Sequence, residues 1–208
     1  MVTITDMEQS EPASVVLKLG GHRALDFLNT WREPGEVEET LADGRAFGDW
    51  LVAVGHLDDP ELAKLRRRFG EAAMDAAAAE ARRFREWARE WLARWRRAPR
   101  GRYAHELDEL NRVLAREDRN RQVFAGKAGL EVREVPAFES AAALVSLPAA
   151  DVADLVTRED PYLIRECAGE PCTLWFLDRT RSHRRRFCSA AACGNRAKVA
   201  AFRERQRD

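Results

Sequence analysis

The sequence predicts an α+β fold that is mainly helical, followed by a small cysteine-containing module at the C-terminal end. Apolar residues recur at spacings of three and four over most of residues 22–157, as they do on the buried sides of helices. Residues 122–135 differ, because two β-prone runs flank a glycine-containing turn, which predicts one antiparallel hairpin. The chain has 4 cysteines, and all of them lie in residues 161–208.

The charge distribution separates an acidic body from a basic C-terminal module. Residues 161–208 carry 11 Lys and Arg against 5 Asp and Glu, a net charge of +6. Residues 1–160 carry 24 Lys and Arg against 30 Asp and Glu, a net charge of −6, so the whole chain has a formal charge of +0. A basic module on a neutral chain suggests a polyanionic partner for that module, with a merely solvated surface as the alternative.

The N-terminal stretch combines a polar segment, a short strand and a short helix. We expect residues 1–12 to be disordered and residues 15–19 to form the strand. The helix, expected over residues 22–31, contains three polar side chains among apolar ones. They are Asp26, Asn29 and Thr30. Buried polar groups need partners, so these residues predict either a ligand pocket or a satisfied polar network that fixes the helix, and we favour the network.

Three further helices are predicted between residues 47 and 97. The first ends at Gly55, and the second begins with Asp59 as N-cap and is interrupted at Gly70. The third, residues 71–97, carries an aromatic stripe that we expect to face the core, although such stripes can also stack bases or line a pocket. Its members are Phe84, Trp87, Trp91 and Trp95. Arginines interleaved with glutamates on the other side predict a solvated face.

The next segments are a helix and the hairpin. The helix should turn three leucines inward. They are Leu107, Leu110 and Leu114. The hairpin strands are expected over residues 122–125 and 130–135, with Pro136 closing the pair.

The body ends in one more helical segment. Residues 138–157 show helical periodicity, and Pro148 should force a kink or a restart. Residues 159–161 mark the boundary, so the body spans residues 13–160 and the C-terminal module residues 161–208.

The two cysteine pairs predict a structural metal site. The spacing is four residues within each pair, and the four residues are Cys167, Cys172, Cys188 and Cys193. Four thiolates close a tetrahedral shell around Zn²⁺, and the short loops reduce the entropic cost of assembling it. Two disulfides and ordinary buried thiols are the alternatives, but disulfides are rare in cytosolic proteins. We therefore expect one structural zinc ion.

The sequence favours neither an enzyme nor a membrane protein. It contains no glycine-rich phosphate loop, serine elbow or metalloprotease helix, and a four-thiolate site leaves zinc no open position. No apolar run is long enough for a transmembrane helix, and the N-terminus lacks a signal-peptide core. We expect a cytoplasmic protein without a membrane partner.

The residues around the cysteines resemble a known family. The run Cys193-Gly194-Asn195-Arg196, with residues 175–178 (WFLD) and the basic loop of residues 179–186, closely resembles the bacterial CGNR zinc-finger proteins. Residues 24–30 (ALDFLNT) resemble the ABATE domain usually joined to that finger. The resemblance implies a treble-clef-like zinc finger and a transcription regulator.

The treble-clef arrangement assigns a place to each part of the finger. Cys167 and Cys172 would form the zinc knuckle, and residues 173–178 would pair with residues 185–187. Cys193 would then lie in the first turn of the last helix, whose N-terminus favours a thiolate.

The basic residues of the finger predict contacts with DNA. Loop arginines suit phosphates, and they are Arg179, Arg181, Arg184, Arg185 and Arg186. Lys198 and Arg203 lie on charged stripes of the last helix. Asn195 and Arg196 suit the edges of adenine and guanine, although we favour a capping or backbone-binding role for Asn195.

Two hypotheses of function follow. The first is a DNA-binding transcription regulator whose N-terminal domain senses an unknown small molecule or a protein. The alternative is a zinc-stabilised protein-interaction module without sequence-specific DNA binding. Salt-dependent binding to DNA distinguishes them.

Overall fold

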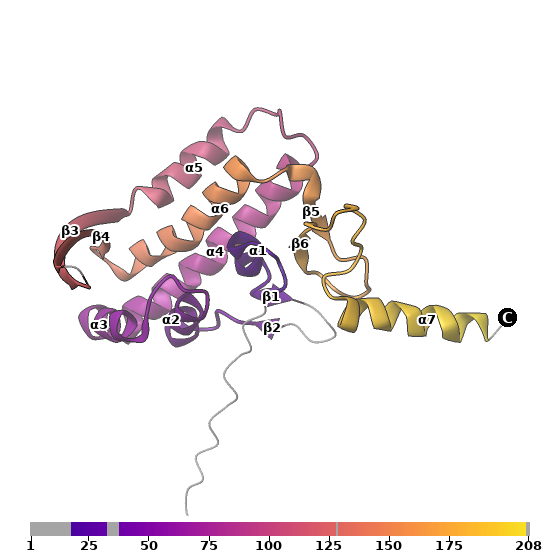
Figure 1. The fold of residues 1–208 in the computed structure, drawn as a ribbon, viewed down its shortest axis with the longest axis horizontal. Helices are drawn as coiled ribbons and strands as arrows, with labels where there is room; N and C mark the ends of the chain where they lie inside the picture. The colour runs from indigo at the N-terminus through magenta and orange to yellow at the C-terminus, as the bar shows by residue number, and fades with distance from the viewer. Residues whose placement is uncertain (1–17, 33–37, 128, 207–208) are drawn as a thin grey trace, which may run out of the picture.

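The computed structural model describes residues 18–32, 38–127 and 129–206 (Figure 1). The segment expected to be disordered lies outside these residues, as does most of the strand expected over residues 15–19. Helices dominate, and each sheet in the described residues is a two-stranded antiparallel pair. The expected class, a mainly helical α+β fold, is confirmed.

The body is a bundle of helices around the central helix α4 (Figure 1). The helix bounds are α1 Arg23–Leu28, α2 Gly44–Ala53, α3 Asp59–Phe69, α4 Glu71–Trp95, α5 Ala104–Leu114 and α6 Ser146–Arg158. Helix α4 contacts α1, α2 and α3, while α6 contacts α1 and α5. The aromatic stripe of α4 faces the core as expected, with Phe84, Trp91 and Trp95 buried and Trp87 packed against them.

The helix boundaries follow local chemistry, with one correction. Asp58, not Asp59, is the N-cap of α3, because its carboxylate accepts a hydrogen bond from the Glu61 N–H at 2.8 Å. The Glu61 carboxylate accepts one from the Asp58 N–H at 2.8 Å, which completes a capping box. Gly70 separates α3 from α4 at a φ of 78°, which only glycine adopts without strain.

The structure revises part of the expected inward face of α5 and explains the restart before α6. Leu110 and Val113 are buried, whereas Leu107 is 47% exposed, so the prediction for Leu107 is wrong. A 3₁₀ turn, η1 (Ala141–Val145), precedes α6. Pro148 lies in the first turn of α6, where backbone N–H groups have no acceptor within the helix, so a proline costs no hydrogen bond there.

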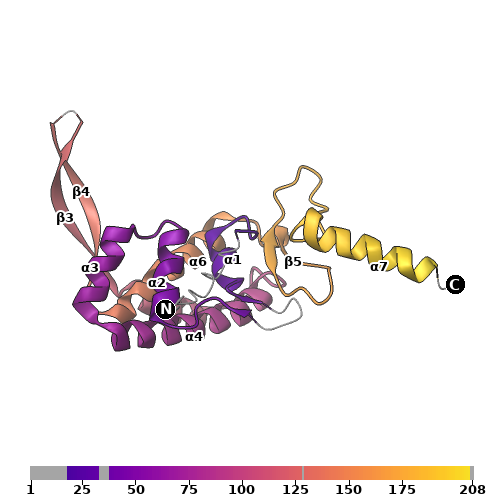
Figure 2. The same cartoon turned by 90° about the horizontal axis from the view of Figure 1, so that it is seen from below.

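The hairpin is longer than expected and projects from the body. Strand β3 (Glu117–Gly126) pairs along its whole length with β4 (Gly129–Phe138). Pro136 does not close the pair, because it lies within it opposite Arg119. Both strands are edges, and proline is tolerated on an edge. Figure 2 shows the hairpin extending away from the helices.

A buried arginine ties α4 to a small strand pair that the sequence did not suggest. Strand β1 (Trp31–Arg32) pairs with β2 (Glu38–Glu39). The Arg85 side chain, 2% exposed, donates to both carboxylate oxygens of Glu39 at 2.8 and 2.6 Å and to Thr30 Oγ1 at 2.9 Å. Burial alone would lower the pKa of Arg85, but the carboxylates of Glu39 and Glu86 raise it. The guanidinium therefore stays charged inside the body.

The C-terminal module shares the core of the body. After the 3₁₀ turn η2 (Pro161–Leu163), strand β5 (Ile164–Glu166) pairs with β6 (Trp175–Leu177). Ile164, Trp175 and Leu177 belong to the same hydrophobic cluster as the body helices. The last helix, α7 (Asn195–Arg205), projects away from the body at the end opposite the β3–β4 hairpin (Figures 1 and 2). Among the described residues, no helix combines the length and apolarity that crossing a membrane requires.

Candidate metal centre and nucleic-acid interface

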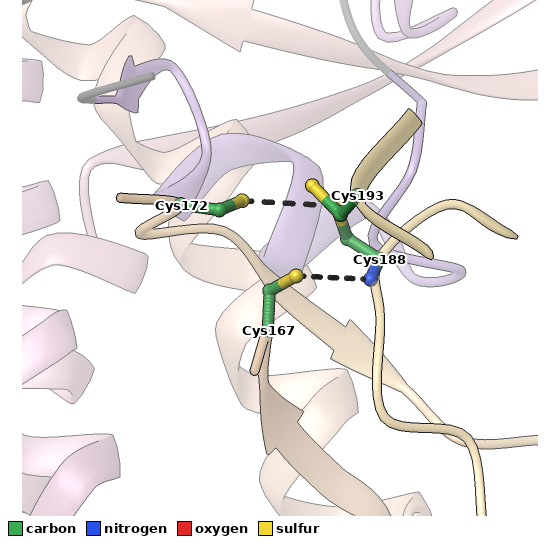
Figure 3. Close-up of side chains that lie close together, drawn as sticks. All are labelled: Cys167, Cys172, Cys188 and Cys193. Atoms are coloured by element: carbon green, nitrogen blue, oxygen red, sulfur yellow. Dashed lines mark hydrogen bonds between the residues drawn. The ribbon is translucent and has the colours of Figure 1, made fainter. Parts of the chain in front are cut away.

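The four cysteines converge on one point in the C-terminal module (Figure 3). Their sulfur atoms all lie within 4.8 Å of one another, and the Sγ of Cys188 lies 3.8 Å from that of Cys172 and 3.6 Å from that of Cys193. These separations are non-bonded, so the thiols are not paired as disulfides. A tetrahedron with Zn–S bonds of about 2.3 Å has edges of about 3.8 Å. The donor set and its spacing therefore fit a tetrahedral metal ion.

The thiols also need a cation to ionise together. Burial, with the other thiols of the cluster, raises the pKa of Cys172 to about 11 and raises that of Cys188 as well. Burial acts in the same direction on Cys167, but backbone N–H groups, including that of Cys188 at 3.3 Å, lower its pKa overall. Several buried thiolates are stable together only beside a positive charge, and a metal ion supplies that charge.

Backbone hydrogen bonds position each ligand. Cys167 follows β5, and its N–H donates to Leu174 O at 2.9 Å, which closes the loop that carries Cys172. Cys193 lies in a π-helical turn, η3 (Ala190–Gly194), that runs directly into α7. Cys193 thus lies just before α7, in the turn that leads into it, and not in the first turn of α7 as expected.

The strand partner within the finger differs from the prediction. Strand β6 pairs with β5, with Ile164 opposite Leu177, and not with residues 185–187. Those residues form no strand, although the Ala168 N–H donates to Arg186 O at 2.8 Å. The sequence indicated no strand at residues 164–166, because three residues are too few to show the alternation of a strand.

Asp178 is a buried anchor for the basic loop. It is 0% exposed, and its carboxylate accepts bonds from the Thr180 N–H, the Thr180 hydroxyl and the Arg185 N–H at 3.1, 2.6 and 2.9 Å. Burial acts to raise the pKa of Asp178, but these bonds lower it overall. The carboxylate is charged and shapes the loop that follows it.

Arg185 makes contacts inside the finger, and its expected role as a phosphate contact stays a prediction. Its guanidinium donates to Phe187 O at 2.9 Å and to Cys188 O, and lies over the Phe176 ring at 4.3 Å. These contacts occupy the charged head inside the module. They engage Nε and Nη2 of the guanidinium.

Arg185→Ala is therefore expected to loosen the metal centre. The loss of two charge-assisted bonds beside Cys188 should cost about 2–3 kcal/mol of finger stability. The measurement is the rate of zinc release to a chromogenic chelator, which should rise about tenfold or more. Arg184→Ala is the matched control, since Arg184 is exposed and makes no interaction with the described residues. Equal release rates for the two variants would contradict this role.

The other loop arginines are more accessible. Arg181, Arg184 and Arg186 are exposed, and Arg186 stacks over the Phe187 ring at 5.6 Å. Arg179 is also exposed but pairs with Glu159 at 2.6 Å. The loop thus presents charge to solvent at several neighbouring positions.

Helix α7 carries the remaining predicted DNA contacts on its surface. Asn195, Lys198 and Arg203 are exposed, and no residue of α7 is buried. The Asn195 side chain does not cap α7, so of the two roles that we favoured only the backbone-binding one stays a prediction, beside contact with a base. Arg196 is exposed but donates to the Sγ of Cys193 at 3.0 Å, so part of its guanidinium is directed at the metal centre.

The three polar residues expected in the first helix lie in a satisfied network, with Asp26 inside α1, Asn29 as its C-cap and Thr30 just after it. The Asp26 carboxylate accepts from the Gly20 N–H at 2.8 Å, and Thr30 Oγ1 donates to Phe27 O at 2.7 Å. The Asn29 side chain bonds both the N–H and the C=O of Trp175 at 2.8 Å. Burial is the main influence on Asp26 and raises its pKa. This is the network alternative, and it joins the body to the finger.

A cavity of about 480 Å³ lies between the body and the metal centre. Leu19, Arg32 and Glu38 line it from the body, and Asn195 and Arg196 line it from the start of α7. Sequence reasoning did not indicate this cavity, because its walls come from segments far apart in the chain.

Comparison with known families covers almost all the described residues. Residues 21–159 match the ABATE family, described as "Putative stress-induced transcription regulator". Residues 164–206 match the family described as "CGNR zinc finger". Neither description names an enzyme. No curated protein matches the sequence.

Proposed function

Because this chain belongs to the ABATE family and ends in a CGNR zinc finger, we propose that it is a DNA-binding transcription regulator. In this proposal one structural Zn²⁺ orders the finger, the finger binds DNA, and the helical body senses a small molecule or a protein. The geometry of the described residues supports each of these three steps.

The four cysteines would hold the zinc ion, which supplies the charge and the tetrahedral cross-link that a module with so small a core lacks. Among the described residues, the finger's own cluster buries Leu174, Phe176, Cys188 and Cys193, with a few half-buried side chains packed against them. So few buried side chains cannot offset the entropy of ordering the loop and α7. Zinc is proposed over iron or copper because a closed four-thiolate site in a structural module is typical of zinc.

The projecting helix carries the proposal for DNA. Helix α7 extends beyond the body, as Figures 1 and 2 show, and none of its residues is buried, so most of its surface is free to enter a groove. Major grooves admit an α-helix, and Asn195, Lys198 and Arg203 lie exposed along this one. The exposed loop arginines beside it suit phosphates.

The test is a titration of the full chain with duplex DNA at several salt concentrations. If about five basic groups contact phosphates, log affinity should fall against log salt with a slope of about −4 to −5. The triple variant Arg181→Ala, Arg184→Ala, Arg186→Ala should weaken binding to all sequences and flatten the slope by about 2–3. Arg185 is left intact because it stabilises the finger.

A matched control removes the same charge from the body. Lys64, Arg67 and Arg68 are exposed on α3, and their triple alanine variant should leave affinity and slope nearly unchanged. Equal effects of the two triple variants, or no binding at low salt with zinc bound, would contradict the DNA proposal.

The body is positioned to influence the finger. Arg89 donates to Leu28 O in the body at 3.0 Å and to Thr173 O in the finger at 3.2 Å, and its guanidinium lies over the Trp175 ring at 5.5 Å. With the Asn29 bonds, these contacts link α1 and α4 to the loop beside Cys172. A ligand or partner that shifts α1 or α4 would move the finger, and the cavity of about 480 Å³ is a candidate place for a small molecule.

One observation favours protein docking as a second candidate. Val199 and Phe202 on α7 are 41% and 56% exposed, although apolar side chains gain nothing from a position facing phosphates. If α7 docks onto a protein, Phe202→Ser should abolish that complex and leave DNA affinity unchanged. If α7 enters DNA, Phe202→Ser should alter DNA affinity.

A further inference from the structure

A second cavity, of about 400 Å³, lies where the end of α4 meets the finger. Arginines dominate its lining, with Glu166 as its one acidic residue. The arginines are Arg96, Arg97, Arg165, Arg185 and Arg186. Two come from the end of α4 and three from the finger, so the site exists only because the two parts pack together.

The inner wall of this cavity is held in place and stays positive. Arg96 lies over the Trp175 ring at 4.9 Å and pairs with Glu166, and Arg165 donates to His183 O at 3.0 Å. The Nε atoms of Arg96 and Arg165 are buried without a hydrogen-bond partner. Arg165 Nε forms an ion pair with Asp178 Oδ2 at 3.5 Å, and that oxygen also accepts a hydrogen bond from the Arg185 N–H. Because these two atoms are covered, the wall offers a ligand the positive charge of its guanidinium groups and not their Nε donors.

The mouth of the cavity has free guanidinium groups. Arg97 and Arg186 are exposed, and neither forms an ion pair or a side-chain hydrogen bond with the residues that the structure describes. Tyr162 completes the rim with a ring that is 66% exposed, and an exposed aromatic ring stacks readily on a nucleobase.

We propose that this cavity binds a phosphate group, carried either by the DNA backbone beside the finger or by a free nucleotide. Guanidinium forks match phosphate oxygens in geometry as well as charge, and five of them surround a volume typical of ligand pockets. If the phosphate belongs to DNA, the inference rests on the proposed function and extends the DNA interface from the finger onto α4. If it belongs to a nucleotide, the site stands independently of DNA binding.

The experiment uses the full, zinc-loaded chain and the variant Arg97→Glu. Arg97 lies outside the finger and makes none of the contacts that hold the wall, so the substitution should leave the fold intact. Arg83→Glu is the matched control, because Arg83 is an exposed arginine of α4 that does not line the cavity. Each protein is titrated with AMP by calorimetry and with duplex DNA by fluorescence anisotropy at several salt concentrations, and circular dichroism confirms the fold of both variants.

The two sources of phosphate give different results. If the phosphate belongs to a free nucleotide, AMP should bind the unmodified chain and the Arg83→Glu variant with equal affinity. The Arg97→Glu substitution should then weaken the affinity for AMP about tenfold or more. For the DNA backbone, AMP should not bind measurably, while Arg97→Glu should weaken DNA binding about tenfold relative to Arg83→Glu and flatten the salt slope by about 1. If DNA binds and the two variants behave identically in both titrations, the inference is wrong and the proposed function stands. If the unmodified chain binds neither AMP nor DNA, both the inference and the proposed DNA-binding function are wrong.

Discussion

Cys188→Ser is expected to abolish stoichiometric zinc binding and to lower the stability of the whole chain. Cys188 is 2% exposed and its Sγ lies within 3.8 Å of two other ligand sulfurs, so its loss opens the tetrahedral shell. Structural zinc contributes about 10–16 kcal/mol to the folding of zinc-finger peptides. The finger should therefore lose its order, including the approach of α7 to the metal centre.

The effect should spread to the body because the two parts share a core. The loop between β5 and β6 carries Cys167 and Cys172, so its release frays the pair that buries Ile164, Trp175 and Leu177 against the helices. Each such side chain contributes about 1.5–3 kcal/mol when buried. A loss of roughly 3–6 kcal/mol would lower the melting temperature by roughly 6–24 °C for a chain of this size.

Elemental analysis and thermal unfolding measure the two parts of this prediction. The unmodified chain should hold one zinc ion, and chelation should reproduce the melting temperature of the variant. Chelator added to the variant should have no further effect, which serves as the internal control. A variant that keeps one zinc ion and the original melting temperature would show that Cys188 is not a ligand.

Asn29→Ala is expected to cost about 2–6 kcal/mol of unfolding free energy. The Asn29 amide satisfies both the N–H and the C=O of Trp175, and all of these groups are buried. Alanine leaves the two backbone groups without partners, and each such group costs about 1–3 kcal/mol. The substitution also removes a direct tie between α1 and β6, so it should weaken the coupling of the body to the finger.

Denaturant unfolding of the full chain measures this cost. Asn111→Ala is the control, because Asn111 is an exposed residue of α5 where alanine is a better helix former, and its stability should be unchanged or slightly higher. Similar stabilities of the two variants would show that the Trp175 backbone finds other partners. A large loss without any change in zinc content would assign the cost to the body–finger junction and not to the metal centre.

The sequence determined the features that depend on local chemistry. Helical periodicity located α2, α3 and α4, and Gly55 and Gly70 located the ends of α2 and α3, because both signals arise within one or two turns of chain. The cysteine pairs indicated the metal centre for the same reason, since each pair forms one short chelate loop. The polar residues Asp26, Asn29 and Thr30 were predicted to be buried and partnered, and their burial is confirmed.

Only the tertiary structure decided which distant groups meet. Nothing near Asn29 in the chain indicates that its partner is the backbone of Trp175, and nothing near Arg85 indicates Glu39. Arg184 and Arg185 are indistinguishable in a run of arginines, yet one faces solvent and the other holds the carbonyls beside a metal ligand. Periodicity and spacing report which face of an element is buried, whereas contacts between elements depend on packing, and packing positioned the finger against the end of α4 and created the arginine-lined cavity there.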